Sequence, residues 1–464
     1  MGKIKNKLAF YPALLAGKGL MVYYKKQGKE RSDHAGMGAM RICPDFLKYV
    51  KKPPLTVIAS GTNGKTTVTG MVAKLLTLQG MSVTYNDWGA NHHAGHARCL
   101  LGAVNIFNRS TKDAAVVEMD ELVSPINLPA IKPQYAIITN IGRDSMLGNA
   151  HPNYIREKME KAAELSPDTF YIVNADNPLC VDIGKNNRRV FYGVADLKTN
   201  PRPSLTDDFP VCSICGTKPV YKYRNYRLIG DYECPCCGFK RPHCDYFVEK
   251  VNYENHTITV REPKGIFIYP ANSLFVHNIY NYVSVIAMFR EMGMESDVLA
   301  NYLKDVYPPQ SRETTQKIGD ITLKSVLCKG QNVSAASTVF EAVAREDGEK
   351  CLVLLLDEYF RDPKKSETIA WIFDTDYEYL NDPKIKQIIV GGQRYLDHRV
   401  RLLMAGIPAE KMTFVQDYHE VVKYVPTSGV DTVYVLHDVN FVTRGQQIRD
   451  EIKQKLIDAG RNEE

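Results

Sequence analysis

The sequence predicts an α/β protein built on mainly parallel sheets, and three observations support this fold class. Short apolar runs rich in β-branched residues alternate with segments whose apolar residues recur at helical spacing. One of these runs leads into a glycine-rich turn that opens a helix. The composition, with 44% hydrophobic and 24% charged residues, is ordinary for a globular chain. Strands and helices in alternation favour a parallel sheet that is covered by helices.

The expected elements follow in chain order. Strand-like runs occupy residues 55–60, 114–119, 135–140 and 170–174, and then residues 351–356, 387–390 and 433–436. Helical spacing is clearest at residues 68–79 and 277–292. The runs are as short as buried strands usually are, and the intervening stretches are long enough for helices.

The chain has 464 residues, which suffice for two or three domains. We predict an N-terminal segment at residues 1–50, a central domain at residues 51–310 and a C-terminal α/β domain at residues 315–464. A Pro-Pro-Gln-Ser stretch at residues 308–311 is typical of a linker between the last two. Pro, Cys, Tyr and charged residues replace the apolar periodicity between residues 196 and 247, so we predict a module inserted at residues 205–245.

Charge and targeting signals exclude several classes of protein. The net charge of +6 is too small to indicate nucleic-acid binding, although it suits anionic substrates. No run reaches the ~18 apolar residues of a membrane span. The apolar segment from Leu8 to Tyr24 lacks a signal-peptide cleavage site, and we expect a packed helix there; a helix at the inner membrane surface is the alternative. An odd count of eleven cysteines predicts reduced thiols and a cytoplasmic protein, with at most peripheral membrane contact.

A phosphate-binding turn is the first motif that carries chemistry. It consists of Gly61, Thr62, Asn63, Gly64, Lys65, Thr66 and Thr67, between the first strand and its helix. Backbone N–H groups in such a turn point at phosphates. We expect Lys65 to neutralise the β- and γ-phosphates of a nucleotide and the Thr66 hydroxyl to bind Mg²⁺. Ala59 replaces the first glycine of the general pattern, and an ordinary glycine-rich turn is the alternative.

Two cysteine pairs form the second motif. Cys212 and Cys215, then Cys234 and Cys237, have two residues between the members of each pair. Four thiolates make a closed tetrahedral Zn²⁺ site, so we predict a structural zinc ribbon. We expect Cys236 to be a bystander, with Cys244 as a substitute ligand and buried reduced thiols as the alternative to a metal site. No second basic, aromatic patch accompanies the ribbon, so nucleic-acid binding is not expected.

The turn and several later segments resemble the Mur ligases. Residues 59–67 are similar to the nucleotide loop of that family, and three further segments resemble its motifs: Thr139-Asn140-Ile141 followed by Asp144, Asn174-Ala175-Asp176-Asn177-Pro178, and His277-Asn278-Ile279-Tyr280-Asn281. The cysteine insertion, together with residues 44–47, 86–95 and 392–406, resembles the MurT branch. The resemblance spans nearly the whole chain and implies a Mur-ligase-like central domain, an inserted four-cysteine zinc ribbon and a MurT-type C-terminal α/β domain.

The resemblance also implies an activity. MurT proteins pair with a GatD-type glutaminase and amidate the α-carboxylate of D-glutamate in the stem peptide of lipid II. The implied reaction is an ATP-dependent amide ligation in three parts. ATP phosphorylates the carboxylate to an acyl phosphate, the partner releases ammonia from glutamine, and ammonia displaces phosphate.

Roles for single residues follow from the motifs and the resemblance together. Lys65 and Mg²⁺ are expected to stabilise the charge of the transferring phosphoryl group. Glu118, at the end of the strand at residues 114–119, is predicted as the second Mg²⁺ ligand, with Asp120 as the neighbouring alternative. The resemblance implies that Asn278 faces the adenine ring.

For two cationic residues, an ordinary surface role explains the sequence as well as a functional role does, or better. Arg312 is predicted to clamp a phosphate at the domain junction, and a surface ion pair explains it equally well. Lys158 lies where related ligases carry a carbamylated lysine, but a solvated helix lysine is expected here.

The sequence departs from the MurT pattern near the expected partner. Relatives carry an Asp-Gly-x-Asp-x-Ser-Trp segment that is thought to supply an acid to the glutaminase, whereas residues 357–374 retain Trp371 and Asp374 but not the glycine. Asp362 and Glu367 are the nearest acids, and we predict that one of them couples to the partner. Residues 144–147 and 329–333 depart from the pattern as well.

Two other functions compete with the amidating subunit. A stand-alone ligase would join another carboxylate to an amino acid and would need no glutaminase. A non-catalytic scaffold would use the ribbon and the C-terminal domain only, and the intact turn from Gly64 to Thr66 argues against it because a scaffold needs no phosphate cradle.

Overall fold

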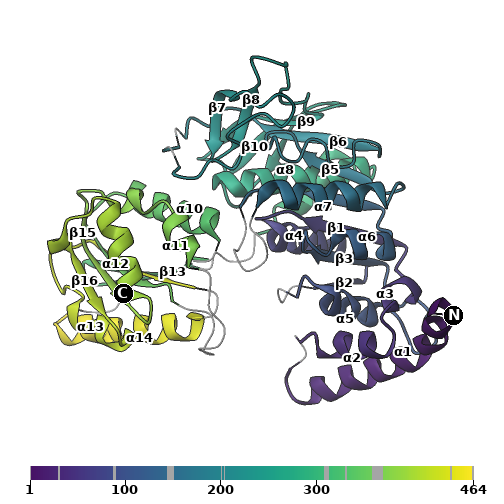
Figure 1. Cartoon of the computed structure of the whole chain (residues 1–464), viewed down its shortest axis with the longest axis horizontal. Coiled ribbons are helices and arrows are strands. Elements are labelled where there is room, and N and C mark those ends of the chain that lie inside the picture. The colour runs from purple at the N-terminus through teal and green to yellow at the C-terminus, as the bar shows by residue number, and fades with distance from the viewer. Residues whose placement is uncertain are drawn as a thin grey trace. The chain divides into compact units, whose positions relative to one another are not determined.

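The computed structural model shows two compact units (Figure 1). It describes residues 2–29, 32–86, 90–143, 151–199, 201–202, 204–307, 313–329, 332–357, 369–438 and 441–461. The first unit comprises Met1–Gly142, Pro152–Arg202 and Asp208–Pro309, and the second comprises Arg143–His151, Pro203–Asp207 and Gln310–Glu464. The predicted α/β fold class with parallel sheets is confirmed.

The first unit is organised by a nine-stranded sheet in the order β11-β10-β9-β6-β5-β4-β1-β3-β2. From β9 to β2 in this order, each strand runs parallel to its neighbours within that range. Central strands such as β1 and β3 are buried along nearly their whole length, as apolar strands covered on both faces must be. The bounds are β1 Leu55–Ser60, β2 Val83–Tyr85, β3 Ala114–Met119, β4 Tyr135–Ile138, β5 Phe170–Asn174, β6 Arg189–Val194, β9 Tyr246–Asn252, β10 Thr257–Glu262 and β11 Gly265–Pro270.

Helices cover both faces of this sheet. On one face, α4 (Lys65–Leu78) and α8 (Val276–Glu291) contact each other and the central strands. The crossovers through α5 (His93–Ala103), α6 (Ser124–Ile131) and α7 (Pro152–Glu164) run in the opposite direction along the sheet, so right-handed connections put them on the other face. α9 (Ser296–Leu303) packs beside β11.

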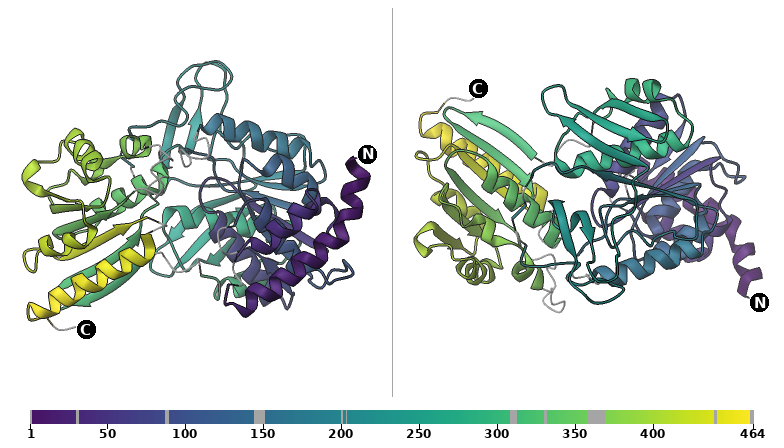
Figure 2. Two further views of the ribbon diagram at one scale, coloured as in Figure 1. Left: turned by 60° about the horizontal axis from the view of Figure 1, so that its bottom comes forward. Right: turned by 90° about the horizontal axis from the view of Figure 1, so that it is seen from above.

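The expected N-terminal helix is present as α1 (Gly2–Lys26), which lies at the outer edge of the first unit and is purple in Figure 2. It packs against α2 (His34–Ile42), α3 (Phe46–Tyr49) and α5. Lys18, which interrupts its apolar run, donates to the carbonyl of Leu101, 2.6 Å away, near the end of α5. A lysine there offsets the negative end of the helix dipole. Within the described part of the chain, every helix is too short or too polar to cross a bilayer.

Strands β9–β11 are an addition to the predicted elements. They pair antiparallel, and β10 alternates partly exposed and buried residues along its length. A strand that is buried on one face has few apolar residues, so it lacks the continuous apolar run that marks β1. The inserted module is a hairpin of β7 (Val220–Tyr226) and β8 (Ile229–Glu233) that forms its own two-stranded sheet.

The second unit has a six-stranded sheet in the order β12-β13-β17-β14-β15-β16. All neighbours are parallel except β12 and β13. The C-terminal helix α14, yellow in Figure 2, packs on β13 and β17. The bounds are β12 Glu313–Ile318, β13 Ile321–Leu327, α10 Val333–Arg345, β14 Lys350–Leu355, α11 Ala370–Asp374, β15 Ile385–Gly391, α12 Tyr395–Met404, β16 Met412–Val415, α13 Val421–Tyr424, β17 Thr432–His437 and α14 Val442–Asp458. The predicted linker at residues 308–311 lies outside the described residues.

Candidate functional site

The phosphate-binding turn lies between β1, which ends at Ser60, and α4, which begins at Lys65. Gly61 and Gly64 have φ angles of +126° and +88°, which side chains rarely adopt. A Cβ atom at Gly61 would lie 2.3 Å from Thr139 Oγ1, and one at Gly64 would lie 2.6 Å from Asn281 Oδ1. The two glycines are therefore required by conformation and by space.

A second loop holds the turn from behind. The backbone N–H of Thr62 donates to the carbonyl of Asn140 at 2.7 Å, and the N–H of Asn63 donates to Asn140 Oδ1 at 3.1 Å. Thr139 Oγ1 donates to the carbonyl of Asn63 at 2.6 Å. The Thr-Asn segment after β4 thus fixes the backbone of the turn.

Lys65 is buried and has an acidic partner that the sequence analysis did not identify. Its Nζ atom donates to the carbonyl of Gly61 at 2.6 Å and to Glu121 Oε1 at 3.0 Å. Glu121 is 1% exposed, so this is a buried ion pair. The ion pair keeps the ammonium group folded back over the turn. The signal for Glu121 was the group of three acids at residues 118, 120 and 121, where β3 ends.

Glu118 occupies the neighbouring strand end, because β1 and β3 pair with Ala59 opposite Glu118. Its backbone is fixed by Asn86, which accepts from the N–H of Glu118 at 2.7 Å and donates to its carbonyl at 3.0 Å. His96 Nε2 lies 2.9 Å from the same carbonyl. Glu118 Oε2 is buried and has no hydrogen-bond partner among the described residues. An unpaired carboxylate oxygen beside a phosphate turn fits a divalent cation such as Mg²⁺.

The remaining predicted residues of this region differ in how they are engaged. Thr66 and Thr67 are half-buried in the first turn of α4. Asp120 is used locally, since its Oδ1 accepts from the N–H of Leu122 at 2.9 Å. Asn278 lies in the first turn of α8, where its Nδ2 donates to Ser273 Oγ at 2.7 Å and its Oδ1 accepts from Asn281 at 3.2 Å. Asn281 in turn packs on Gly64, which brings the start of α8 to the phosphate turn.

Four cysteines of the inserted module converge on one point. Their Sγ atoms all lie within 4.8 Å of one another, and the four residues are Cys212, Cys215, Cys234 and Cys237. The Cys212 and Cys237 sulfurs are 3.6 Å apart, and those of Cys215 and Cys234 are 3.4 Å apart. Four sulfurs at this spacing can surround a single metal ion.

Each cysteine pair belongs to a tight turn closed by a glycine. The N–H of Cys212 donates to the carbonyl of Thr217, and the N–H of Gly216, with φ +76°, donates back to Cys212. Cys234, Phe239 and Gly238 repeat this arrangement. Hydrogen bonds with Thr217 lower the pKa of Cys215 to about 6, so this thiol readily becomes the thiolate that binds metal.

The two neighbouring cysteines lie outside the cluster. Cys236 is exposed, and Cys244 is buried with its sulfur 3.9 Å from the carbonyl of Pro242. Burial raises the pKa of the Cys244 thiol. This agrees with the expectation that Cys236 is a bystander, and it leaves the substitute ligand Cys244 unused.

In the second unit, the retained MurT-like residues have structural partners. Trp371 is buried on α11 with its ring 5.8 Å from that of His398. Asp374 Oδ2 accepts from Arg143 at 2.7 Å. Asp357, which follows β14, accepts from the N–H of Arg394 at 3.1 Å.

Gly392 lies against the same carboxylate. A Cβ atom at Gly392, where φ is +119°, would lie 2.5 Å from Asp357 Oδ2. In the sequence, Asp357 marks only the start of the segment at residues 357–374, and no local pattern pairs it with the Gly392 loop. Arg312, Asp362 and Glu367 lie outside the described residues. Lys158 lies in α7 with its Nζ 4.9 Å from the centre of the Tyr154 ring.

The comparisons with known proteins cover both units. The model of the Mur ligase middle domain matches residues 59–207, and the model of the MurT ligase C-terminal domain matches residues 330–439. The MurT subunit of lipid II isoglutaminyl synthase (glutamine-hydrolyzing) from Streptococcus pneumoniae is 28% identical over 431 residues, which are 91% of this chain and 93% of that protein. Its namesake from Staphylococcus aureus (strain COL) is 27% identical over 82% of this chain and 84% of that protein.

Solved structures share the fold at lower identity. A pseudomurein peptide ligase type C from Methanothermus fervidus has a TM-score of 0.66 at 19% identity, covering 88% of this chain and 81% of that one. MurF ligase from Thermotoga maritima, solved in complex with ADP, has a TM-score of 0.59 at 15% identity, covering 92% of this chain and 85% of that one. Two family models thus match separate parts of one chain, and along nearly its full length the chain is similar to the MurT branch of the Mur ligases.

Proposed function

We propose that this chain is the ATP-dependent, amide-forming subunit of a lipid II isoglutaminyl synthase. The phosphate-binding turn between β1 and α4 carries this proposal, because its two glycines and Lys65 are built for the phosphates of a nucleotide. The relatives named as MurT subunits of that enzyme, which match along nearly the full chain, supply the substrate class. Proposed substrates are ATP, ammonia and the D-glutamate α-carboxylate of the lipid II stem peptide.

The proposed chemistry has two steps. A carboxylate oxygen attacks the γ-phosphorus of ATP, giving an acyl phosphate and ADP. Ammonia then attacks the acyl carbon, phosphate leaves with the C–O bonding electrons, and loss of a proton yields the amide. Charge on the transferring phosphoryl group is the main barrier, and Lys65 would offset it after exchanging its bond to Glu121 for the phosphates.

Two metal sites belong to the proposal. Thr66 and Glu118 would hold Mg²⁺, which would supply positive charge to offset that of the phosphates. The buried, unpaired Glu118 Oε2 supports this role. Zn²⁺ is proposed for Cys212, Cys215, Cys234 and Cys237, since a tetrahedral set of four thiolates suits that ion. A metal held by all four cysteines would be structural, because no coordination position would be left open.

The remaining roles are proposals from the sequence. Asn278 would contact the adenine ring from the start of α8, and Arg312 would clamp a phosphate. A GatD-type glutaminase would supply ammonia, and Asp362 or Glu367 would couple to it. The proposed domain division is 51–310 for the nucleotide-binding part and 315–464 for the part that meets the partner. A cytoplasmic location follows from the use of ATP and of a lipid-linked precursor.

The test is reconstitution with a GatD-type glutaminase and lipid II. Mass spectrometry of lipid II after incubation with ATP, Mg²⁺ and glutamine should reveal conversion of one carboxylic acid to an amide. Ammonium chloride should replace glutamine and partner together, because ammonia is the proposed nucleophile. Lys65→Ala should abolish product in both arms. Unchanged lipid II in the wild-type arms would contradict the proposal.

A stand-alone ligase remains the alternative function. ATP hydrolysis that depends on a different acid and an added amino acid, with lipid II unchanged, would favour it. A non-catalytic scaffold would show no ATP turnover with any acceptor, and equilibrium binding of ATP that survives Lys65→Ala would support it.

A further inference from the structure

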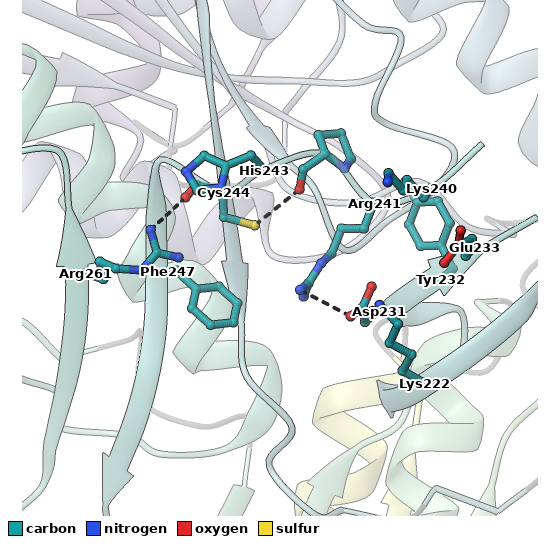
Figure 3. Close-up of a pocket in the computed structure, with 11 residues that line it drawn as sticks. Lys222, Asp231, Tyr232, Glu233, Lys240, Arg241, His243, Cys244, Phe247 and Arg261 are labelled. Carbon is teal, nitrogen blue, oxygen red and sulfur yellow. Dashed lines mark hydrogen bonds and ion pairs between the residues drawn. The ribbon is translucent and has the colours of Figure 1, made fainter. Parts of the chain in front are cut away.

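The ribbon hairpin is attached to the sheet through Arg241. The metal-binding turn from Cys234 to Gly238 leads from β8 to this residue, whose backbone N–H donates to the carbonyl of Tyr232 in β8 at 3.0 Å. Figure 3 shows Arg241 and Asp231 pointing toward each other beside a polar pocket of about 290 Å³. Their closest N–O distance is 3.4 Å. The cysteine turn and Asp231 together orient the guanidinium group.

The far side of Arg241 reaches a buried carboxylate of the sheet. Its Nη1 atom lies 3.2 Å from Asp176 Oδ1, and Asp176 is fully buried just beyond the end of β5. Val194 donates its N–H to Asp176 Oδ2 at 2.9 Å. The carbonyl of Asp176 accepts from the N–H of Gly230 in β8 at 2.9 Å. Burial raises the pKa of Asp176 to about 6, and Arg241 and Tyr280 oppose this rise, so the ionised form depends on them.

Tyr280 connects this carboxylate to the helix beside the phosphate turn. Its hydroxyl donates to Asp176 Oδ2 at 2.7 Å and accepts from Asn225 Nδ2 of β7 at 2.9 Å. Tyr280 lies in α8 directly before Asn281, whose Oδ1 packs on Gly64 of the turn. A continuous set of contacts therefore runs from the four cysteines through Arg241, Asp176 and Tyr280 to the phosphate turn.

We propose, resting on the proposed function, that Asp176 and Tyr280 are positioning residues that couple the ribbon metal to nucleotide binding. The metal fixes the turn that aims Arg241 at Asp176, and Asp176 then holds Tyr280 and the start of α8 against Gly64. Neither residue touches the reacting atoms. Because coupling between two binding equilibria is reciprocal, metal must tighten nucleotide binding by the same factor by which nucleotide tightens metal binding. A factor of about 5 to 150 is typical of such coupling.

The matched variants are Tyr280→Phe and Tyr282→Phe. Both tyrosines are buried in α8, and each hydroxyl both donates and accepts a hydrogen bond. The hydroxyl of Tyr282 bonds to Val306 and Asn272 instead. Neither of these residues belongs to the ribbon or contributes to the contacts from the cysteines to the phosphate turn. The two variants thus cost similar interactions, but only Tyr280→Phe breaks the proposed link.

The experiment uses the full-length, zinc-loaded chain and measures two affinities. The Kd of a nonhydrolysable ATP analogue with Mg²⁺ is measured by calorimetry, and the Zn²⁺ affinity is measured by competition with a chromophoric chelator, with and without the analogue. In the wild type and in Tyr282→Phe, the analogue should strengthen Zn²⁺ retention at least about fivefold. In Tyr280→Phe, this effect should fall to near unity while Zn²⁺ still binds.

Each outcome has a defined meaning. Equal effects of the analogue in Tyr280→Phe and the wild type would overturn the coupling, as would no effect in the wild type. An effect lost equally in Tyr282→Phe would also overturn it, because any damage to α8 would then suffice. No binding of the analogue to the zinc-loaded wild type would refute the proposed function, which distinguishes that failure from loss of coupling alone.

Discussion

Glu118 has a buried carboxylate oxygen that is unfavourable for stability but suited to binding a cation. Its Oε2 atom is buried without a hydrogen-bond partner among the described residues, although the backbone around it is held by Asn86 and His96. A buried carboxylate without a partner is unfavourable in the absence of a cation. Glu262 offers the contrast, because it is also a buried strand glutamate but lies 2.6 Å from Arg290.

Glu118→Gln should therefore separate function from stability. We expect the Mg²⁺ concentration for half-maximal ATP turnover to rise at least about tenfold, which corresponds to about 1.4 kcal/mol. The Tm of the metal-free protein should stay unchanged or rise, since the variant replaces a carboxylate whose buried Oε2 has no partner among the described residues. Glu262→Gln is the control, and by breaking a buried pair it should cost about 3 kcal/mol in urea unfolding. A loss of stability in Glu118→Gln as large as that in the control would contradict this account.

His96 is held in its neutral form beneath the same strand end. Its Nε2 atom lies 2.9 Å from the carbonyl of Glu118, and its Nδ1 lies 2.6 Å from Asn127 Nδ2. Nδ1 must accept from that amide, so Nε2 carries the proton. Burial lowers the pKa of His96 from 6.5 to about 3, and a second proton would face the amide donor.

A pH dependence of stability follows, with a definite sign. Above pH 6.5 neither the folded nor the unfolded state protonates His96, so its contribution to stability is complete there. As the pH falls from 6.5 toward 3, the unfolded state gains a proton that the folded state refuses, and stability is lost. The slope from this residue is about 1.4 kcal/mol per pH unit. The free energy of unfolding, measured with urea from pH 7.5 to about 4.5, should change less with pH in His96→Gln than in the wild type. His34→Gln, at an exposed histidine, should retain the wild-type slope.

At the scale of elements, the sequence was most informative where one strand is fully buried. The predicted strands at residues 55–60, 114–119 and 170–174 coincide with β1, β3 and β5, because continuous apolar runs mark strands covered on both faces. In β9 and β10 charged residues interrupt the apolar ones, and the apolar residues of the edge strand β11 are largely exposed. The phosphate turn and the cysteine pairs could also be predicted from local patterns, because the residues of each motif lie close together in the sequence.

Contacts between distant segments explain what the sequence did not reveal. The pairing of Lys65 with Glu121, and of Arg241 with Asp176, joins residues more than fifty positions apart. Such pairs depend on strand order and register, which no local motif encodes. Asp357 and the Gly392 loop meet for the same reason, since β14 and β15 are neighbours in the sheet.

The ribbon is an element whose fold should depend on metal. We expect one equivalent of Zn²⁺ per chain in the purified protein, measured by elemental analysis. Cys234→Ser should lose the metal, because three thiolates leave the site open and weak. Cys236→Ser is the matched control in the same turn, and it should retain a full equivalent because Cys236 is exposed and outside the cluster. Equal loss in both variants would show that the assigned ligand set is wrong.

At the scale of the whole molecule, the two units have separate cores, and the second unit takes up two short segments from the sequence range of the first. The core of the first unit is one continuous cluster, and the second has one cluster on each face of its sheet. The second unit also includes Arg143–His151 and Pro203–Asp207, which the chain order would assign to the first. Short segments without periodicity carry no sequence signal of where they pack, so the grouping of these two segments could not be predicted.

The segment Pro203–Asp207, which belongs to the second unit, should stabilise that unit selectively. Ser204 Oγ donates to Asp376 at 2.8 Å and the N–H of Leu205 donates to it at 2.6 Å, while Asp376 is 1% exposed. Asp376→Ala leaves both donors without this carboxylate, at a cost of about 3 kcal/mol. Calorimetry of the full chain should resolve two transitions, one per core, and only that of the second unit should move to lower temperature. Asp347→Ala, which removes an exposed ion pair with Lys384 in the same unit, should leave both transitions in place. A shift of both transitions in Asp376→Ala would contradict a selective role for this segment in the second unit.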